Sequence, residues 1–332
     1  MITATAPGRC GLVGNPTDMY GGSVVSCSTR ERARCTLSAA AVITLTISGQ
    51  TQMIRSRNDL ALQDDYLDVA RAVLLALEVE PGHTTPFHLS ADTQIPMQAG
   101  LAGSTAILAT LVGCVLAHLD LRLNPYQTAE LVRRIEYDVL GIVCGFQDHY
   151  MAVFGGLNFM DFRGKSSAQT QDDTTPLAVV EPLQSYVAQD LPLLLAHTGV
   201  KHHSGSVHKS PRARWLAGDP AVVDGYKEVE HLARMAKRAL LSCDWDTLAD
   251  LMNCSHAIVR DLGGSGESNE ALIAAALEGG ALGAKLAGAG GGGTILALTR
   301  DPDRTERALL NAGADQILRP QPAPGLSVER QQ

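Results

Sequence analysis

A glycine-rich loop that leads into a long apolar helix is the feature that most constrains this chain. The stretch IPMQAGLAGSTAILATLVGCVLAHLD (95–120) opens with a proline, and its apolar spacing predicts a helix from about Ser104 to His118. Gly100 and Gly103 allow close backbone approach, and Ser104 stands at the expected N-cap. A helix N-terminus carries unpaired N–H groups and a partial positive charge, which suit a polyphosphate. The lysine of a P-loop is absent, so the alternatives are a different phosphate loop and an ordinary capped core helix.

Composition indicates a globular protein with a substantial core. The chain has 332 residues, 45% hydrophobic and 19% charged, enough for two ordinary domains. Its formal net charge of −8 argues against a nucleic-acid partner. We expect no membrane span, because apolar runs stay short of the ~20 residues a membrane helix needs, and no signal peptide. The seven cysteines are scattered and never spaced CxxC, which favours a reducing cytoplasm over disulfides or a zinc site.

Strand and helix patterns mix along the chain without a steady βαβ rhythm, which predicts two α+β domains rather than a doubly wound sheet. We expect an N-terminal domain at 1–185, a C-terminal domain at 186–320 and a disordered tail at 321–332. The polar segment 163–176 is expected to be an exposed loop near the boundary. The patterns predict strands at 41–48, 85–92 and 150–162, and helices at 66–79, 126–140, 221–241, 244–260 and 268–278.

Two further glycine segments flank this region. In APGRCGLVGNPTDMYGG (6–22), a short apolar strand precedes a turn with Asn15 and Asp18, residues that either shape the turn or bind a polyol. The segment GAGGGG (288–293) formally matches GxGxxG. A dinucleotide-binding motif follows a strand and opens a helix, whereas here a helix is expected before the loop and a strand after it. A dinucleotide oxidoreductase is therefore excluded.

Two carboxylates have the character of functional groups. Glu136 is expected in or beside the apolar stripe of its helix, where an unpaired carboxylate is rare. Asp148 stands between aromatic residues, at the expected start of a strand. Either one alone is more often a surface charge or a cap. Combined with a phosphate loop, they supply a Mg²⁺ ligand and a group that orients or deprotonates an acceptor hydroxyl, as phosphoryl transfer requires.

The segments APGRCGLVGNPTD, PMQAGLAGSTA and KLAGAGGGG, in this order and at these distances, resemble the three motifs of the GHMP small-molecule kinases. This resemblance implies a ribosomal protein S5 domain 2-like N-terminal domain that binds ATP and Mg²⁺, followed by a ferredoxin-like C-terminal domain. Within the family, QDHYMAVFGGLNFMDF and SGSVHKSPRARWLAGD resemble the sugar 1-kinases that act on glucuronate. The implied reaction is ATP-dependent phosphorylation of the anomeric hydroxyl of a sugar, D-glucuronate, by a cytoplasmic monomer or homodimer.

The resemblance also implies roles for individual residues. Asp148 would be the catalytic base or orienting group, and Arg9 would steady it and the developing charge. Ser104 and Glu136 would hold Mg²⁺. The ATP-binding residues would be Gly100, Leu101, Ala102, Gly103, Ser104 and Thr105, and the substrate-binding residues Asn15, Asp18, Gly290 and Gly291.

Departures from the family pattern leave alternatives open. GNP replaces the Gly-Glu-His of galactokinases, and AGS replaces the Gly-Ser-Ser of many members. A uronic acid needs a cationic partner for its carboxylate, and the forked guanidinium of arginine suits it best. Several basic residues of the chain could supply this partner, or they could be only solvated loop charges. Other possibilities are a kinase for a different aldose or a heptose phosphate, and a non-catalytic sugar sensor. The candidate cations are Arg212, Arg214, Lys201 and the His202-His203 pair.

Overall fold

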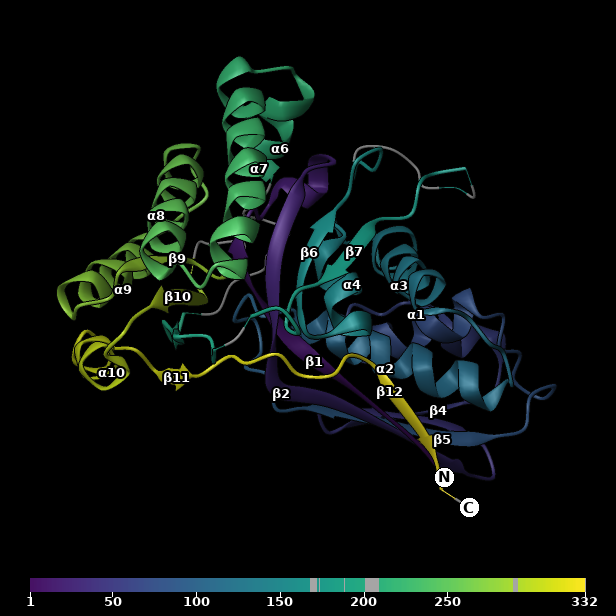
Figure 1. The fold of residues 1–332 in the computed structure, drawn as a ribbon. Coiled ribbons are helices and arrows are strands. Elements are labelled where there is room, and N and C mark those ends of the chain that lie inside the picture. Colours follow the sequence, from purple (N-terminus) through teal and green to yellow (C-terminus); the bar gives the residue numbers. More distant parts are fainter. Residues whose placement is uncertain (168–171, 173, 188, 201–208, 289–291, 332) are drawn as a thin grey trace.

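The computed structural model describes residues 1–332 except 168–171, 173, 188, 201–208, 289–291 and 332. Two β-sheets, each with its own helices, lie side by side (Figure 1). Apart from its edge strand β12 (Ser327–Arg330), the first sheet is built from residues 2–182, and the second sheet is built from residues 193–318. The prediction of two α+β units is thereby confirmed. The last strand before the predicted boundary at 185/186 ends at residue 182 and belongs to the first sheet, and the next strand begins at residue 193 and belongs to the second.

The first sheet is built around one long strand. β2 pairs along its length with β1, β5 and β6, all antiparallel, while β3 pairs parallel with β5. The order across the main path is β12-β1-β2-β5-β3-β4, and β7 pairs with β6 at the side. The strands from this part of the chain are β1 (Ile2–Val13), β2 (Ser23–Ala39), β3 (Ile43–Ile47), β4 (Gln50–Ile54), β5 (Phe87–Thr93), β6 (Leu157–Asp161) and β7 (Val179–Pro182).

The predicted helix after the glycine loop is α2 (Gly103–His118), and it lies at the centre of the first domain. It packs against β1 and β2 on one side and against neighbouring helices on the other, which explains why it is apolar all round. The other helices here are α1 (Asp68–Ala76), α3 (Pro125–Arg134) and α4 (Gln147–Phe154), with a π-helical turn η3 (Ile135–Val139) and 3₁₀ turns η1 (Thr17–Tyr20) and η2 (Arg57–Leu60).

The second sheet has the strand order β11-β8-β10-β9, antiparallel throughout, which is the order of a ferredoxin-like fold. Its strands are β8 (Leu193–His197), β9 (Gly283–Leu286), β10 (Thr294–Leu298) and β11 (Gln316–Leu318). The accompanying helices are α6 (Lys209–Leu216), α7 (Pro220–Leu241), α8 (Trp245–Asp261), α9 (Glu267–Glu278) and α10 (Pro302–Asn311). None of the described helices is long and apolar enough to cross a membrane.

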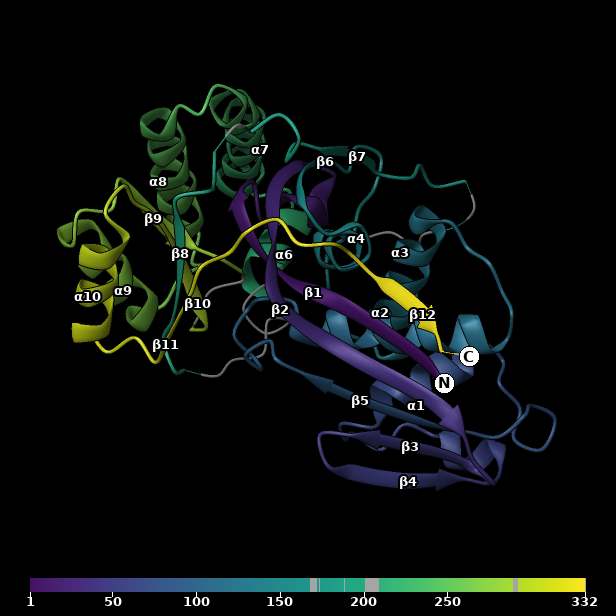
Figure 2. The same cartoon turned by 60° about the horizontal axis from the view of Figure 1, so that its bottom comes forward.

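The C-terminal tail corrects the prediction of disorder at 321–332. Residues 327–330 form β12 (Ser327–Arg330), which pairs antiparallel with the start of β1. Figure 2 shows the yellow tail leaving the second domain and returning beside β1. The guanidinium of Arg32 donates to the carbonyl oxygens of Pro324 (2.6 Å) and Gly325 (2.7 Å), so a partner distant in sequence orders this proline-rich stretch.

Two local predictions were also wrong. Residues 147–154 form α4, whereas their β-branched and aromatic composition predicted a strand beginning near Asp148. Tertiary contacts of α4 with β1, β2 and α2 override that preference. The glycine loop at 288–293 joins two antiparallel strands, since β9 rather than a helix directly precedes it. Near the end of this loop, Gly292 is held by Asn269. The side-chain amide of Asn269 accepts from Gly292 N–H (2.7 Å) and donates to Gly292 O (3.0 Å).

Candidate active site

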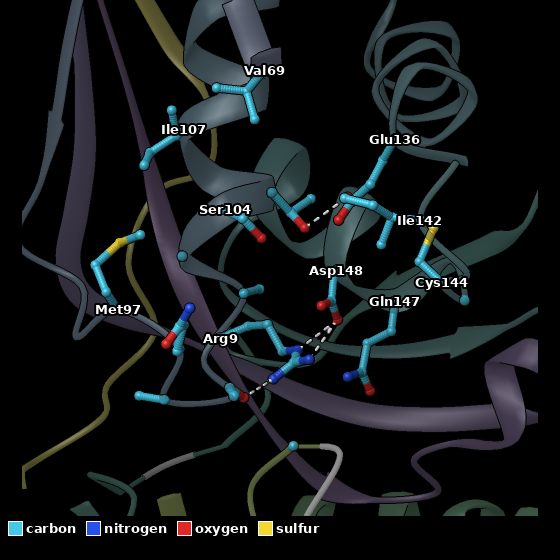
Figure 3. A pocket seen from close by; sticks show the side chains of 18 of the residues that line it. Arg9, Val69, Met97, Ser104, Ile107, Glu136, Ile142, Cys144, Gln147 and Asp148 are labelled. Atoms are coloured by element: carbon cyan, nitrogen blue, oxygen red, sulfur yellow. Dashed lines mark hydrogen bonds and ion pairs between the residues drawn. The ribbon is translucent and has the colours of Figure 1, made fainter. Parts of the chain in front are cut away.

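A cavity of about 610 Å³ lies where the three glycine segments meet. Its wall combines the end of β1, the loop that precedes α2, the segment 141–148 and Gly288 of the second domain. In Figure 3, Ser104, Glu136 and Asp148 face the same space, with Arg9 below them. The fold therefore gathers into one cavity segments that lie more than 250 residues apart in the chain.

The N-terminus of α2 has the form that an anion site requires. Ala102 occupies the N-cap in the left-handed region (φ 60°), so the helix begins at Gly103, and Ser104 is the second helical residue rather than the predicted N-cap. Ala106 N–H donates to Ala102 O at 2.9 Å, so the N–H groups of Gly103, Ser104 and Thr105 precede the first helical hydrogen bond. Ser104 is exposed in the cavity. Unpaired donors and the helix dipole together favour a phosphate here.

Arg9 joins the predicted catalytic carboxylate to the predicted phosphate loop. Its Nε and Nη2 lie 2.8 and 2.6 Å from Asp148 Oδ1, and its Nη1 donates to Gly100 O at 2.6 Å. The backbone N–H of Arg9 also donates to Leu101 O at 3.0 Å. Arg9 is buried, whereas 31% of the Asp148 side chain is exposed. Asp148 is thus held firmly by one oxygen and remains accessible from the cavity.

Glu136 is buried and hydrogen-bonded, as the sequence led us to expect of a carboxylate on an apolar stripe. Its Oε2 accepts from Thr105 Oγ1 at 2.9 Å and lies 2.8 Å from His149 Nε2. The hydroxyl of Thr105 is therefore directed at Glu136, and any role of Thr105 in phosphate binding falls to its N–H. Sequence reasoning missed His149, because only the fold brings this ring, which α4 carries, to Glu136 in η3.

Cys144 completes this corner of the cavity. Its Sγ lies 3.9 Å from His149 Nε2. Burial, followed by the nearby charge of Glu136, raises the pKa of Cys144 well above its usual value. The side chain is thus a neutral thiol rather than a reactive thiolate.

Asp18 supports the helix that carries Asp148. Its Oδ2 accepts the backbone N–H groups of Phe146 (2.8 Å) and Gln147 (3.0 Å) at the start of α4, and these two groups have no other hydrogen-bond partner among the described residues. Only 6% of Asp18 is exposed. Burial, opposed by these N–H groups, raises the pKa of Asp18, and the charge of Asp148 adds to the rise. Asp18 lines the cavity, but its evident role in the structure is to cap α4.

Asn15 links the two domains. Its Nδ2 donates to Gly288 O at 3.2 Å, and its Oδ1 accepts from Lys285 Nζ at 2.9 Å. Lys285 also donates to Gly11 O at 3.0 Å and to Leu286 O. Burial lowers the pKa of Lys285 to about 7. The sequence did not single out Lys285, for which its place in an otherwise apolar strand was the only signal.

The far end of the cavity is apolar and was not predicted. Val69, Ile107 and Met97 line it, together with Tyr66, and Figure 3 places the first three opposite Glu136 and Gln147.

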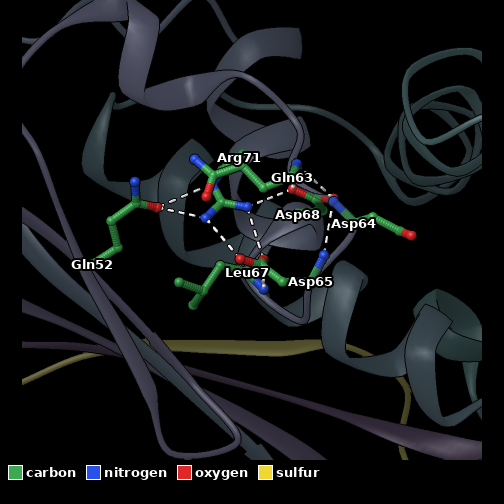
Figure 4. A network of polar contacts seen from close by, with 7 residues as sticks. All are labelled: Gln52, Gln63, Asp64, Asp65, Leu67, Asp68 and Arg71. Carbon is green, nitrogen blue, oxygen red and sulfur yellow. Dashed lines mark hydrogen bonds and ion pairs between the residues drawn. The ribbon is translucent and has the colours of Figure 1, made fainter.

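A polar network fixes α1 at this end of the cavity. As Figure 4 shows, the buried Arg71 donates to carboxylates and an amide around it. Its partners are Asp65 (2.8 Å), Asp68 (2.5 Å) and Gln52 (2.6 Å).

The remaining predicted residues lie elsewhere. Leu101 does not line the cavity, and its side chain is buried in the core. Gly290, Gly291 and the candidate cations at 201–203 lie outside the described residues. Arg214 is bonded to Asp219 at 2.7 Å. Gly288 packs so closely on the loop before α2 that a Cβ there would collide with the carbonyl oxygen of Gly100. The residues that the cavity does bring together are Arg9, Asn15, Asp18, Gly100, Ala102, Gly103, Ser104, Thr105, Glu136 and Asp148.

Comparison with known families agrees with this arrangement. The model of the GHMP kinases N terminal domain matches residues 68–156, and that of the GHMP kinases C terminal domain matches residues 236–315. The chain belongs to the GHMP kinase family, and it is a phosphotransferase.

Particular relatives narrow the comparison. The chain is 30% identical to Probable glucuronokinase 2 of Arabidopsis thaliana over 308 residues, which cover 85% of this chain and 81% of that protein. It is 35% identical to Glucuronokinase 1 of the same plant over 214 residues, 63% of this chain and only 57% of that relative. It is 26% identical to the D-glycero-alpha-D-manno-heptose 7-phosphate kinase of Campylobacter jejuni over 88% of this chain and 87% of that one.

Solved structures share the fold at lower identity. The D-glycero-D-manno-heptose 1-phosphate kinase from Bacteriodes thetaiotaomicron superposes with a TM-score of 0.76 at 22% identity, covering 100% of both chains. The Lactococcus lactis galactokinase complexed with galactose also gives 0.76, at 18% identity, covering 98% of this chain and 95% of the other. These similarities confirm the two-domain GHMP kinase fold.

Proposed function

We propose that this protein transfers the γ-phosphoryl group of ATP to the anomeric hydroxyl of a sugar, with D-glucuronate as the substrate. The products are ADP and glucuronate 1-phosphate. The observation that carries the proposal is the Arg9–Asp148 pair, which stands in one cavity with the free N–H groups at the start of α2. The similarity to the two Arabidopsis glucuronokinases supports the choice of sugar.

The two ends of the cavity suit the two ends of ATP. The apolar side chains near α1 offer a surface for adenine, and the loop at 100–105 offers N–H groups to the triphosphate. Ser104 and Glu136 would hold Mg²⁺. A hydroxyl exposed in the cavity and a carboxylate on its wall are the hard oxygen donors that this ion prefers. When bound, the ion neutralises charge on the phosphates.

Asp148 and Arg9 would act on the acceptor hydroxyl. One Asp148 oxygen is held by Arg9, and the carboxylate can accept the proton of a hydroxyl placed beside it. An anomeric hydroxyl is more acidic than an ordinary alcohol, so one carboxylate suffices. Arg9 keeps its charge throughout and stabilises the negative charge that develops. A protein that only binds sugar needs no such pair, which argues against the sensor alternative.

Arg212 is the described candidate for pairing with the substrate carboxylate. Among the described residues, its Nη2 makes a long hydrogen bond to Ser167 O (3.4 Å), and its buried Nε has no hydrogen-bond partner. Ser167 N–H in turn donates to Met19 O at 2.9 Å, and Met19 lines the cavity. Arg214, on the same helix, is already paired with an aspartate. Replacing Arg212 by leucine should raise the KM for glucuronate, and the same change at Arg214 should not.

An ADP-release assay tests the proposal directly. Glucuronate, galacturonate, galactose, fucose and mevalonate would be compared, and a heptose phosphate would be added because of the Campylobacter relative. We expect turnover with glucuronate, and Asp148→Asn should lower kcat by roughly 10²–10⁴-fold. Absence of turnover with every sugar would refute the sugar-kinase assignment. Preference for a heptose phosphate would refute only the choice of glucuronate as the substrate. Full activity of Asp148→Asn would refute the proposed role of Asp148.

A further inference from the structure

A mixed set of oxygen, sulfur and nitrogen donors lies at the edge of the cavity, and two of its members have no role in the proposed transfer. Glu136, Cys144 and His149 each offer one ligand atom, and these three atoms lie within 4.8 Å of one another. Glu136 comes from η3, His149 from α4 and Cys144 from the segment between them. The scattered cysteines argued against a zinc site, but the fold assembles this cluster without a sequence motif.

The separations are close to those of a metal site. Bonds of ~2.0–2.1 Å to nitrogen, ~2.0–2.2 Å to oxygen and ~2.3 Å to sulfur, at tetrahedral angles, place the ligand atoms about 3.3–3.6 Å apart. Here His149 Nε2 lies 2.8 Å from Glu136 Oε2 and 3.9 Å from Cys144 Sγ. The Glu136 and Cys144 ligand atoms lie within 4.8 Å of each other. Shifts of about 0.5 Å for the two His149 pairs, and of up to about 1.2 Å between Glu136 and Cys144, would accommodate an ion and are within the reach of side-chain rotation.

The donor types select the kind of ion. A thiolate and an imidazole suit Zn²⁺ and other soft or borderline cations, whereas Mg²⁺ prefers oxygen donors alone. The surroundings permit binding. Glu136 and Cys144 line the cavity, which provides an entry path and room for a fourth ligand. In the part of the chain that the structure describes, His149 Nδ1 is buried without a hydrogen-bond partner, so it can take the ring proton without breaking a bond when Nε2 turns to a metal.

We propose that Glu136, Cys144 and His149 form a binding site for a thiophilic divalent cation such as Zn²⁺, and that the bound ion inhibits phosphoryl transfer by occupying the carboxylate assigned to Mg²⁺. On binding, Cys144 releases its proton to solvent and coordinates as a thiolate. The first half of the proposal stands on the geometry alone. The second half, the inhibition, rests on the proposed function.

Cadmium is a suitable probe, because a cadmium thiolate absorbs in the ultraviolet through charge transfer. The full-length protein, kept reduced with a phosphine and free of Mg²⁺, would be titrated with Cd²⁺. We expect one equivalent to produce the band, and Zn²⁺ to displace it. Cys144→Ser should abolish the band, whereas Cys254→Ser, which changes an exposed cysteine outside the cluster, should keep it. His149→Gln should weaken binding at least about tenfold.

The outcomes separate the two halves of the proposal. The proposed metal site would be overturned if the wild-type protein showed no cadmium–thiolate band. It would also be overturned if the band persisted in a folded Cys144→Ser variant. For the inhibition, Zn²⁺ should lower ADP release in competition with Mg²⁺, and Cys144→Ser should raise the inhibitory Zn²⁺ concentration at least about tenfold relative to Cys254→Ser. A Cys144-dependent band without inhibition would overturn the competition. Absence of ADP release with every sugar would refute the proposed function and leave the cadmium result unaffected.

Discussion

Removing the carboxylate of Asp18 should uncouple α4 from the rest of the site. Asp18 Oδ2 accepts two backbone N–H groups, from Phe146 and Gln147, at the start of the helix that carries Asp148. In Asp18→Ala both donors lose their partner. Each buried donor left unpaired costs about 1–3 kcal/mol, and because the adjoining cavity admits water, we expect the lower end, about 2 kcal/mol in total. For a domain of this size, that corresponds to a Tm about 5 °C lower.

The isosteric variant Asp18→Asn separates capping from charge. Its amide oxygen can accept the same two N–H groups. Because burial raises the pKa of Asp18, the wild-type free energy of unfolding falls as the pH rises from the ordinary value of 3.8 to the folded-state pKa, and stays level above it. Asp18→Asn removes this cost. At neutral pH it should therefore be at least as stable as wild type.

Urea and thermal unfolding, with kcat and KM measured alongside, would test this reasoning. We expect Asp18→Ala to lose stability and kcat together, and Asp18→Asn to retain both. Equal losses in the two variants would refute the capping role of Asp18. A normal kcat with a raised KM for sugar in Asp18→Asn would instead favour the substrate contact predicted from the sequence.

Three further predictions concern contacts between distant segments. Gly288→Ala should raise the KM for ATP at least about tenfold, because its Cβ would displace the Gly100 carbonyl; an unchanged KM would contradict the close packing. Arg32→Ala should make residues 321–332 sensitive to limited proteolysis, with wild type resistant under the same conditions. Because burial lowers the pKa of Lys285 from 10.5 to about 7, the unfolded chain binds more protons between these values, and stability rises with pH across that window. Between about pH 6.5 and about pH 8.5, wild type should therefore gain about 2 kcal/mol relative to Lys285→Met in urea unfolding, and parallel curves would contradict this.

The sequence by itself predicted what depends on local pattern. Apolar spacing is a property of neighbouring residues, so α2 and the long helices of the second domain were located within a few residues. The missing lysine excluded a P-loop, so the loop before α2 was predicted to bind phosphate in a different way. The order of the three glycine segments predicted the family. Glu136 was marked as an unusual carboxylate because of its apolar surroundings alone.

Only the tertiary structure decided which groups meet. Asp148 lies in the first turn of a helix, where the carboxylate of Asp18, 130 residues earlier in the chain, satisfies the first N–H groups of that helix. The tail is a strand because β1, at the other end of the chain, offers an unpaired edge. The contacts of His149 with Glu136 and of Lys285 with Asn15 have no sequence spacing to announce them. Such pairs depend on how separate elements pack, and local pattern carries no record of that packing.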